Sequence, residues 1–411
     1  FLDLERNQRK FIPGKSKIPL AFPPYDANEV CEALDSMMKL KTTMGNKVRK
    51  FETEFAKYVG TKYSIMVNSG SSANLLALSI LTNPLLRNKR IKTGDEIITP
   101  AVTWPTTVYP ISNVGAIPKF VDVNLDDFSI NVDEIENAIT KKTKAVMLVH
   151  LLGNPCDMRR IKKIVKQHNL WLIEDACEAH GAKYYQKHVG SFGDLSTFSF
   201  FASHHITTME GGMVLTSNKT LYELGKSLRT FGWVRDLDSR KTLWKKYQKI
   251  DPRFLFVNMG YNFRPTELQG AFGIHQIKKL DNLIKIRIKN AVFWNDKLSP
   301  YDEFLILPKL KTHYKKSFLF YPLTVIKNNY FSKQELVNHL EKAGIETRPV
   351  MAGNILEQPV SKIMKFRKNS KLKNAQYIMR NSFLIGNHHR IKESQREFIA
   401  NTIINFINKK T

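Results

Sequence analysis

Short apolar runs alternate with amphipathic stretches through the first half of the chain. Residues 63–67, 96–99, 145–149 and 170–174 are mostly apolar, which is typical of strands that are buried on both faces. Polar turns follow these runs and lead into segments with apolar residues at helical spacing, such as 132–139 and 157–168. This repeated strand–helix–strand order predicts an α/β domain in which helices cover both faces of one sheet.

The pattern changes at both ends of this region. A basic arm (1–25) precedes a helix from Asn28 that carries Val30, Leu34, Met37 and Met38. After a helix over 219–231, residues 232–256 form a polar connection without clear periodicity. A long helix over 266–297 leads to a smaller mixed part, with strands expected near 304–307, 318–326 and 346–350 and helices over 332–343 and 393–407. We therefore expect an N-terminal arm and helix (1–45), a large α/β domain (46–275) and a small C-terminal α+β domain (276–411).

The chain is strongly basic. Its 64 Lys and Arg against 37 Asp and Glu give a formal net charge of +27 over 411 residues. The basic residues are dispersed, and no basic block interleaved with aromatic residues indicates a nucleic-acid-binding surface. We therefore expect no nucleic-acid partner, and we interpret the charge as favouring an anionic substrate such as a nucleotide-linked sugar.

Membrane insertion and export are not predicted. No apolar run reaches the roughly 18 residues that a membrane-spanning helix needs. Charge begins at Asp3, so the first ten residues do not contain the apolar core of a signal peptide. The three cysteines, Cys31, Cys156 and Cys177, are far apart and form no CxxC pair. These features are typical of a reducing compartment, and we expect the cytoplasm.

Residues 196–212 are the stretch around which the candidate chemistry gathers. An apolar strand opens into a polar turn with two adjacent histidines, His204 and His205, and a Gly-Gly pair follows. Because α/β sheets bind ligands at the carboxyl ends of their strands, this turn is a candidate site. The alternative is a solvated loop after a core strand.

Three other strand ends carry groups that complement one cofactor. The turn from Ser69 to Asn74 opens a helix whose free N–H groups and serine hydroxyls can bind phosphate. Trp104 offers a ring for stacking, and Asp175 offers a carboxylate for a cationic heterocycle. Taken singly, these features could be an N-cap, a core tryptophan and an ion pair. In this order along one α/β chain they fit pyridoxal 5′-phosphate (PLP), with Asp175 keeping the ring nitrogen protonated.

Seven motifs are similar to those of a known family. They lie at residues 68–74, 100–104, 151–155, 172–178, 198–200, 210–212 and 260–262. Through them, residues 15–410 resemble the sugar aminotransferases, which are fold-type I PLP enzymes with an aspartate aminotransferase-like fold. The resemblance implies a large mixed-sheet α/β domain, a small α+β domain and a homodimer with shared active sites.

The resemblance also implies roles for individual residues. It assigns the cofactor phosphate to Gly70, Ser71, Ser72 and Ser199. Trp104 would stack on the ring, Asp175 would pair with the ring nitrogen, and Glu178 would lie near the ring hydroxyl. Asn262 would reach the cofactor phosphate of the neighbouring subunit.

One position departs from the aminotransferase pattern. The family places its Schiff-base lysine five residues after Ser199, where this chain has His204. An imidazole cannot form that covalent bond, but it can move protons near neutral pH. With a histidine in place of this lysine, the chain resembles the sugar 3-dehydratases. The spacing favours His204 over His205 as the base, and no other histidine has metal-ligand spacing with His204, so no metal is expected.

The 3-dehydratases resembled here have two branches. One carries an iron–sulfur cluster and acts on a CDP-linked sugar; the other is cluster-free and acts on GDP-4-keto-6-deoxy-D-mannose. A cluster needs four thiolates, and residues 232–257 contain no cysteine, so we expect no iron–sulfur cluster. Trp104, Glu178 and residues 386–388 resemble the cluster-free branch, whereas residues 11–15 and 169–175 resemble the other. The carrier (GDP, CDP or dTDP) therefore stays open.

The expected activity is 3-dehydration of a nucleotide-linked 4-keto-6-deoxy sugar in dideoxysugar biosynthesis for the lipopolysaccharide O-antigen. L-Glutamate would regenerate pyridoxamine 5′-phosphate (PMP), His204 would act as acid and base, and ammonia would be released. Arg235, Arg348 and His388 are candidates for binding the glutamate carboxylate or the diphosphate. The alternatives are a dehydrase that works with an external reductase and a non-catalytic protein with the aminotransferase fold.

Overall fold

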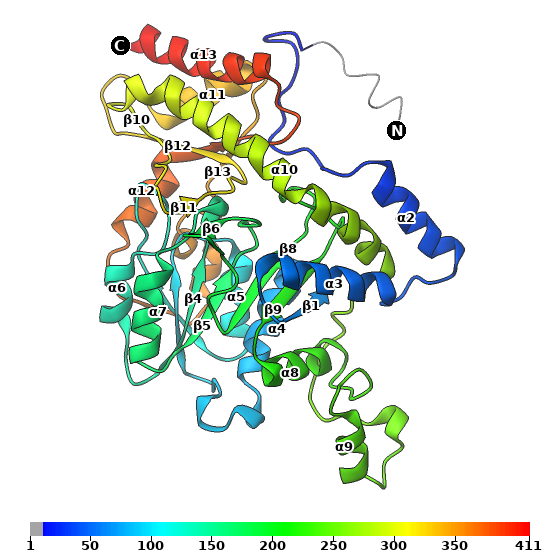
Figure 1. Ribbon diagram of the computed structural model, residues 1–411. Coiled ribbons are helices and arrows are strands. Elements are labelled where there is room, and N and C mark those ends of the chain that lie inside the picture. The colour runs from blue at the N-terminus through cyan, green and yellow to red at the C-terminus, as the bar shows by residue number, and fades with distance from the viewer. Residues whose placement is uncertain (1–10) are drawn as a thin grey trace.

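One large mixed sheet forms the centre of the fold in the computed structural model, which describes residues 11–411 (Figure 1). The first ten residues of the predicted arm lie outside the described part. The strand order is β1-β9-β8-β5-β4-β2-β3-β14. From β14 to β8 neighbouring strands are parallel, and β9 is antiparallel to both β8 and β1. The strands are β1 (Tyr63–Val67), β2 (Glu96–Pro100), β3 (Ile117–Val121), β4 (Thr143–Val149), β5 (Trp171–Asp175), β8 (Leu195–Ser199), β9 (Gly212–Thr216) and β14 (Arg367–Lys368).

Helices cover both faces of this sheet, as the apolar runs predict. In β4, Ala145 and Met147 join the buried cluster beneath α4 and α8, whereas Val146 and Leu148 join the cluster beneath α6 and α7. A strand that is buried on both faces needs apolar residues at every position. The helices around the sheet are α3 (Asn46–Val59), α4 (Gly70–Leu81), α5 (Pro105–Asn113), α6 (Val132–Ala138), α7 (Met158–Gln167) and α8 (Lys219–Arg229).

A smaller α+β part packs on the far end of α10 (Glu267–Leu298). Its sheet has the order β10-β12-β15-β13, with β10 (Leu305–Ile306), β12 (Tyr321–Val325), β13 (Thr347–Pro349) and β15 (Ser382–Ile385). The helices α11 (Lys333–Lys342), α12 (Lys373–Asn381) and α13 (Glu393–Lys410) surround it. β11 (Tyr314–Lys315) pairs with β6 (Lys183–Tyr184), which pairs with β7 (Lys187–His188). Within residues 11–411, no helix is long and apolar enough to cross a membrane.

The structure contains elements that the sequence analysis did not predict. The connection 232–256 contains a helix, α9 (Arg240–Lys246), which lacks buried residues and so leaves no apolar period to detect. α12, β15 and β14 were not predicted. The long helix expected over 266–297 is present as α10, and β14 returns from the C-terminal part to the edge of the large sheet.

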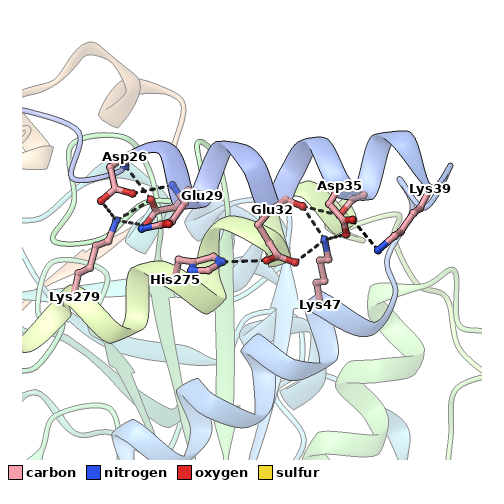
Figure 2. A network of polar contacts seen from close by, with 10 residues as sticks. Asp26, Glu29, Glu32, Asp35, Lys39, Lys47, His275 and Lys279 are labelled. Carbon is pink, nitrogen blue, oxygen red and sulfur yellow. Dashed lines mark hydrogen bonds and ion pairs between the residues drawn. The ribbon is translucent and has the colours of Figure 1, made fainter. Parts of the chain in front are cut away.

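An ion-pair network attaches α2 (Ala27–Met38) to α3 and α10, as Figure 2 shows. Lys47 Nζ on α3 lies 2.7 Å from Glu32 Oε1 and 3.0 Å from Asp35 Oδ2. On α10, Lys279 Nζ lies 2.7 Å from Asp26 Oδ2, and His275 Nε2 lies 3.1 Å from Glu32 Oε2. With Glu29, which also pairs with Lys279, the acidic residues follow at three-residue intervals, so each lies beside the next on the helix surface.

This orientation turns apolar residues of α2 outward. Leu34, Met37 and Met38, which the sequence places in an amphipathic helix, are 47%, 50% and 77% exposed. Ala33 is buried instead, against Phe272 of α10. The helix is thus held by its acidic face, and its apolar face remains open in the single chain.

Candidate active site

A cavity of about 310 Å³ lies where strand ends of the large sheet meet the small domain. β5 and β8 contribute their last residues, Asp175 and Ser199, and the small domain contributes Leu319, Phe320 and Met351. Eight of the residues singled out from the sequence line it: Gly70, Ser71, Trp104, Asp175, Glu178, Ser199, His204 and Arg348. Residues from six separate segments of the chain thus converge on one site.

The first wall is built from the start of α4 and the end of β8. Ser69 caps α4, and its Oγ accepts a hydrogen bond from Ser72 N at 3.1 Å. The N–H groups of Gly70 and Ser71 stand in the first turn, where a helix has no internal acceptor for them. A Cβ on Gly70 would lie 2.4 Å from Ser199 Cβ, so only glycine lets Ser199 come this close. Free N–H groups and a serine hydroxyl therefore converge as an anion site.

The second wall holds the carboxylate of Asp175, which is 4% exposed. Asp175 Oδ2 accepts hydrogen bonds from Thr107 Oγ1 at 2.7 Å and from Asn74 Nδ2 at 2.9 Å. Asp175 Oδ1 accepts from Cys177 N at 3.1 Å. Three donors fix the orientation of this carboxylate at the cavity wall.

Glu178 is a second buried carboxyl group. Burial raises its pKa to about 7, a shift that the hydrogen bond from Leu152 N at 2.8 Å opposes. Near neutral pH, Glu178 is therefore divided between its protonated and ionised forms. It can donate a hydrogen bond to a group in the cavity or accept one from it.

The two adjacent histidines occupy different environments. His204 lines the cavity. Burial, with the positive charges of Arg287 and Arg348, lowers the pKa of His204 to about 4. The imidazole is therefore neutral near pH 7 and can accept a proton. His205 is fully buried, with Nε2 3.1 Å from the carbonyl oxygen of Ser317, and it does not line the cavity.

Arg348 brings a positive charge to the small-domain side of the cavity. Its Cζ lies 5.4 Å from the centre of the Phe320 ring. Within residues 11–411, Arg348 has no carboxylate partner within ion-pair distance. A guanidinium at a cavity wall that is not in a direct ion pair is suited to an anionic ligand group.

Four of the predicted site residues lie outside this cavity. Ser72 takes part in the cap of α4, where Ser69 Oγ donates to its Oγ at 3.0 Å. Asn262 is exposed and accepts from Arg264 Nε at 3.0 Å. Arg235 is exposed and lies 5.2 Å from the Trp233 ring. His388 is buried, with Nε2 3.0 Å from the Pro19 carbonyl oxygen, and thus ties the N-terminal arm to the small domain.

Sequence reasoning missed several residues that line the cavity: Asn74, Thr107, Cys177, Glu210 and Phe320. Asn74 lies one helical turn after Gly70, and Thr107 lies three residues after Trp104. Side chains at these spacings share a helix face with the residue already identified. Helix periodicity could therefore have found these two, whereas the sequence holds no local signal for Phe320.

Fold and site together define an enzyme of the PLP-dependent aminotransferase fold, as the motifs predict. Residues 24–404 match the DegT/DnrJ/EryC1/StrS aminotransferase family, and the chain belongs to this family. GDP-4-keto-6-deoxy-D-mannose 3-dehydratase of Escherichia coli O55:H7 is 39% identical over 376 residues, which are 90% of this chain and 95% of the relative. dTDP-4-dehydro-2,6-dideoxy-D-glucose 3-dehydratase of Saccharopolyspora spinosa is 35% identical over 417 residues, which are 99% and 90% of the two chains.

A solved structure of a similar enzyme has the same fold. The crystal structure of a GDP-4-keto-6-deoxymannose-3-dehydratase with a trapped PLP–glutamate geminal diamine superposes with a TM-score of 0.88. It is 36% identical, and the match covers 94% of this chain and 99% of that one. The predicted family and fold class are thereby confirmed.

The cavity fits a phosphorylated pyridine. One end has the free N–H groups of α4 beside Ser199, and the other has the oriented carboxylate of Asp175. Trp104 is 48% exposed and lines the same cavity. Within residues 11–411, no group of three or more His, Cys, Asp and Glu side chains could hold a metal ion.

Proposed function

We propose that this chain is a PLP/PMP-dependent 3-dehydratase of a nucleotide-linked 4-keto-6-deoxyhexose. L-Glutamate regenerates PMP, and ammonia leaves with each turnover. The observation that carries the proposal is an imidazole, His204, in the wall of a cavity that otherwise has the groups expected of a PLP site. When bound, the cofactor supplies an electron sink through its pyridinium ring. An imidazole cannot hold that cofactor covalently, as the lysine of a transaminase would.

Each wall residue has a role in this reaction. Gly70, Ser71 and Ser199 bind the phosphate, with Ser72 stabilising the turn that presents them. Asp175 holds the ring nitrogen. His204 is neutral near pH 7, so it accepts a proton at a ring nitrogen and returns it to the hydroxyl group that leaves carbon 3 of the sugar.

The remaining groups of the cavity set the orientation of cofactor and substrate. Trp104 stacks on the cofactor ring, and Glu178 meets its hydroxyl group. Arg348, which has no carboxylate within ion-pair distance in the described chain, receives either the glutamate carboxylate or the sugar-nucleotide diphosphate.

GDP is the carrier that the comparisons favour. A relative named as acting on the GDP-linked sugar is 39% identical, against 35% for one named as acting on a dTDP-linked sugar. We therefore take GDP-4-keto-6-deoxy-D-mannose as the first substrate to test. The three cysteines are free thiols, which supports a reducing compartment such as the cytoplasm.

We further propose that the enzyme is a homodimer in which each subunit completes its partner's site. The open apolar face of α2 at Leu34, Met37 and Met38 supports a subunit interface. Arg235 and Asn262 support it as well, because both are exposed and outside the cavity of their own chain. In such a dimer these two residues would reach the partner's cofactor or substrate.

The proposal is tested by incubating the protein with PMP and GDP-4-keto-6-deoxy-D-mannose, without any reductase. We expect release of ammonia and formation of a 4-keto-3,6-dideoxy sugar, and added L-glutamate should sustain turnover. CDP- and dTDP-linked sugars run in parallel report the carrier. If none of the three sugars yields ammonia, the reductase-independent reaction is wrong for this protein.

A further inference from the structure

We infer that Asn74 is a positioning residue that holds the phosphate-binding helix and the ring-nitrogen carboxylate in one rigid unit. Its side-chain amide lies between the two ends of the cofactor cavity. The inference rests on the proposed function only in taking PMP as the ligand of this cavity. It gives Asn74 a task that neither the phosphate turn nor Asp175 performs alone.

The amide of Asn74 bonds to three elements other than its own helix. Nδ2 donates to Asp175 Oδ2 at the end of β5, at 2.9 Å, and to the carbonyl oxygen of Thr106 in α5, at 3.1 Å. Oδ1 accepts from Thr197 Oγ1 in β8, at 2.6 Å. Asn74 itself belongs to α4 and is 1% exposed. These partners use both donor hydrogens, and they fix which way the amide points.

Thr107 completes the support of the carboxylate from the other side. Its Oγ1 donates to the same oxygen, Asp175 Oδ2, at 2.7 Å, and lies 2.8 Å from Thr103 Oγ1. Asp175 Oδ2 is therefore occupied by two protein donors. Within residues 11–411, Asp175 Oδ1 accepts one backbone N–H, that of Cys177, so it keeps a lone pair for a ligand. The network thus selects Oδ1 as the acceptor for a pyridinium N–H.

The absence of a lysine at position 204 gives this network its importance. A cofactor that is bound covalently stays in place even when its other contacts are loose. Here retention depends on non-covalent contacts at the phosphate and at the ring nitrogen, made by parts of the chain far apart in sequence. Groups that must act together hold a ligand more tightly when their spacing is fixed beforehand. Asn74 fixes it, because it stands one turn after the phosphate-binding N–H groups and touches the carboxylate directly.

Asn74→Ala removes the whole amide, and Thr107→Val removes one donor while keeping the shape of the side chain. Thr107→Ser is the conservative variant that restores the hydroxyl group. The matched control is Asn83→Ala, a buried asparagine just after the same helix whose amide bonds to Asn258 and caps a turn outside the cavity. Three quantities are measured without any sugar: the Kd for PMP, the absorbance spectrum of bound PMP against pH, and the melting temperature of the cofactor-free protein.

We expect Asn74→Ala to weaken PMP binding about tenfold or more, the range for loss of a hydrogen bond to a charged group. The spectrum of bound PMP should become pH-dependent near neutrality, since the ring nitrogen loses its fixed carboxylate. Asn83→Ala should change neither property. If Asn74→Ala binds PMP as the wild type does, with a pH-independent spectrum, the inference is overturned.

If Asn74→Ala does not fold, the two variants Thr107→Val and Thr107→Ser test the network instead. Thr107→Val should then show the pH-dependent spectrum and Thr107→Ser should not; identical spectra for both would count against the network. None of these readouts needs dehydration. A chain that binds PMP but fails to release ammonia from the sugar would refute the proposed function and leave the role of Asn74 standing.

Discussion

Replacing Gly70 with alanine should destroy the phosphate site while the chain still folds. The added Cβ would lie 2.4 Å from Ser199 Cβ, 2.7 Å from Ser199 Oγ and 3.2 Å from Ser199 Cα. Ordinary Cβ contacts begin at 3.4 Å, so the start of α4 and the end of β8 must separate by about 1 Å, the difference between 3.4 and 2.4 Å. Overpacking of this kind costs about 1–3 kcal/mol of stability. A displacement of about 1 Å at a catalytic site can lower the rate about 100-fold.

The assay compares the Kd for PMP with the melting temperature of the cofactor-free protein. Gly225→Ala in α8 is the matched control, because its Cβ would lie 2.3 Å from Ile65 Cδ1 of β1, away from the cavity. It should lower the melting temperature and leave PMP affinity unchanged. Adding Ser199→Gly to Gly70→Ala should recover part of the melting temperature, because the contact with the Cα of residue 199 at 3.2 Å remains, but it should not recover the affinity. Wild-type PMP affinity in Gly70→Ala, or equal losses in Gly225→Ala, would refute the close approach as the basis of the site.

Three further predictions concern protons and charges. His204→Phe should lower ammonia release about 10²–10⁴-fold and leave PMP affinity unchanged, because only the acid–base group is lost; a matching loss of affinity would contradict this. Burial raises the pKa of Glu178 from 4.5 to about 7, so its contribution to stability is lost as pH rises through that interval. Glu178→Gln should therefore raise the melting temperature of the cofactor-free protein at pH 8 relative to wild type, with little change at pH 4.5; the opposite order would exclude this cause. Lys47→Met breaks the ion pairs with Glu32 and Asp35 and should cost about 1 kcal/mol in denaturant unfolding at low salt and less at high salt; a salt-independent loss would point to packing instead.

The large sheet was predictable because its strands carry the information locally. A run such as 145–149 is apolar at every position, and only a strand covered on both faces needs that. The two short strands of segment 366–385 lack such a signal. β14 is only two basic residues long, and it and β15 form by pairing with strands distant in the sequence. The helix α12 does carry a helical pattern, with Ala375 and Ile378 buried on one face, so the sequence could have predicted it.

In the site, too, some residues were predictable from the sequence and others were not. The phosphate turn, Trp104 and Asp175 each follow a predicted strand end, so their common location follows from the rule for parallel sheets. The bond between Asn74 and Asp175 spans 101 positions and depends on how α4 lies across the ends of β5 and β8. The start of α4 mattered as well. The helix begins at Gly70, inside the turn that the sequence predicts, and this places Asn74 in its second turn.

The continuous helix α10 runs from the helices beside the large sheet into the core of the smaller α+β part. Its 32 residues extend about 48 Å at 1.5 Å per residue. The first half packs against α2 and α3, and the last turns enter the core of the small domain through Trp294 and Leu298. No proline interrupts it, and its two glycines, Gly270 and Gly273, lie in the first two turns. A hinge motion that opens the cavity would have to bend this helix. Amide hydrogens in the middle of α10 should therefore be among the slowest in the chain to exchange with solvent.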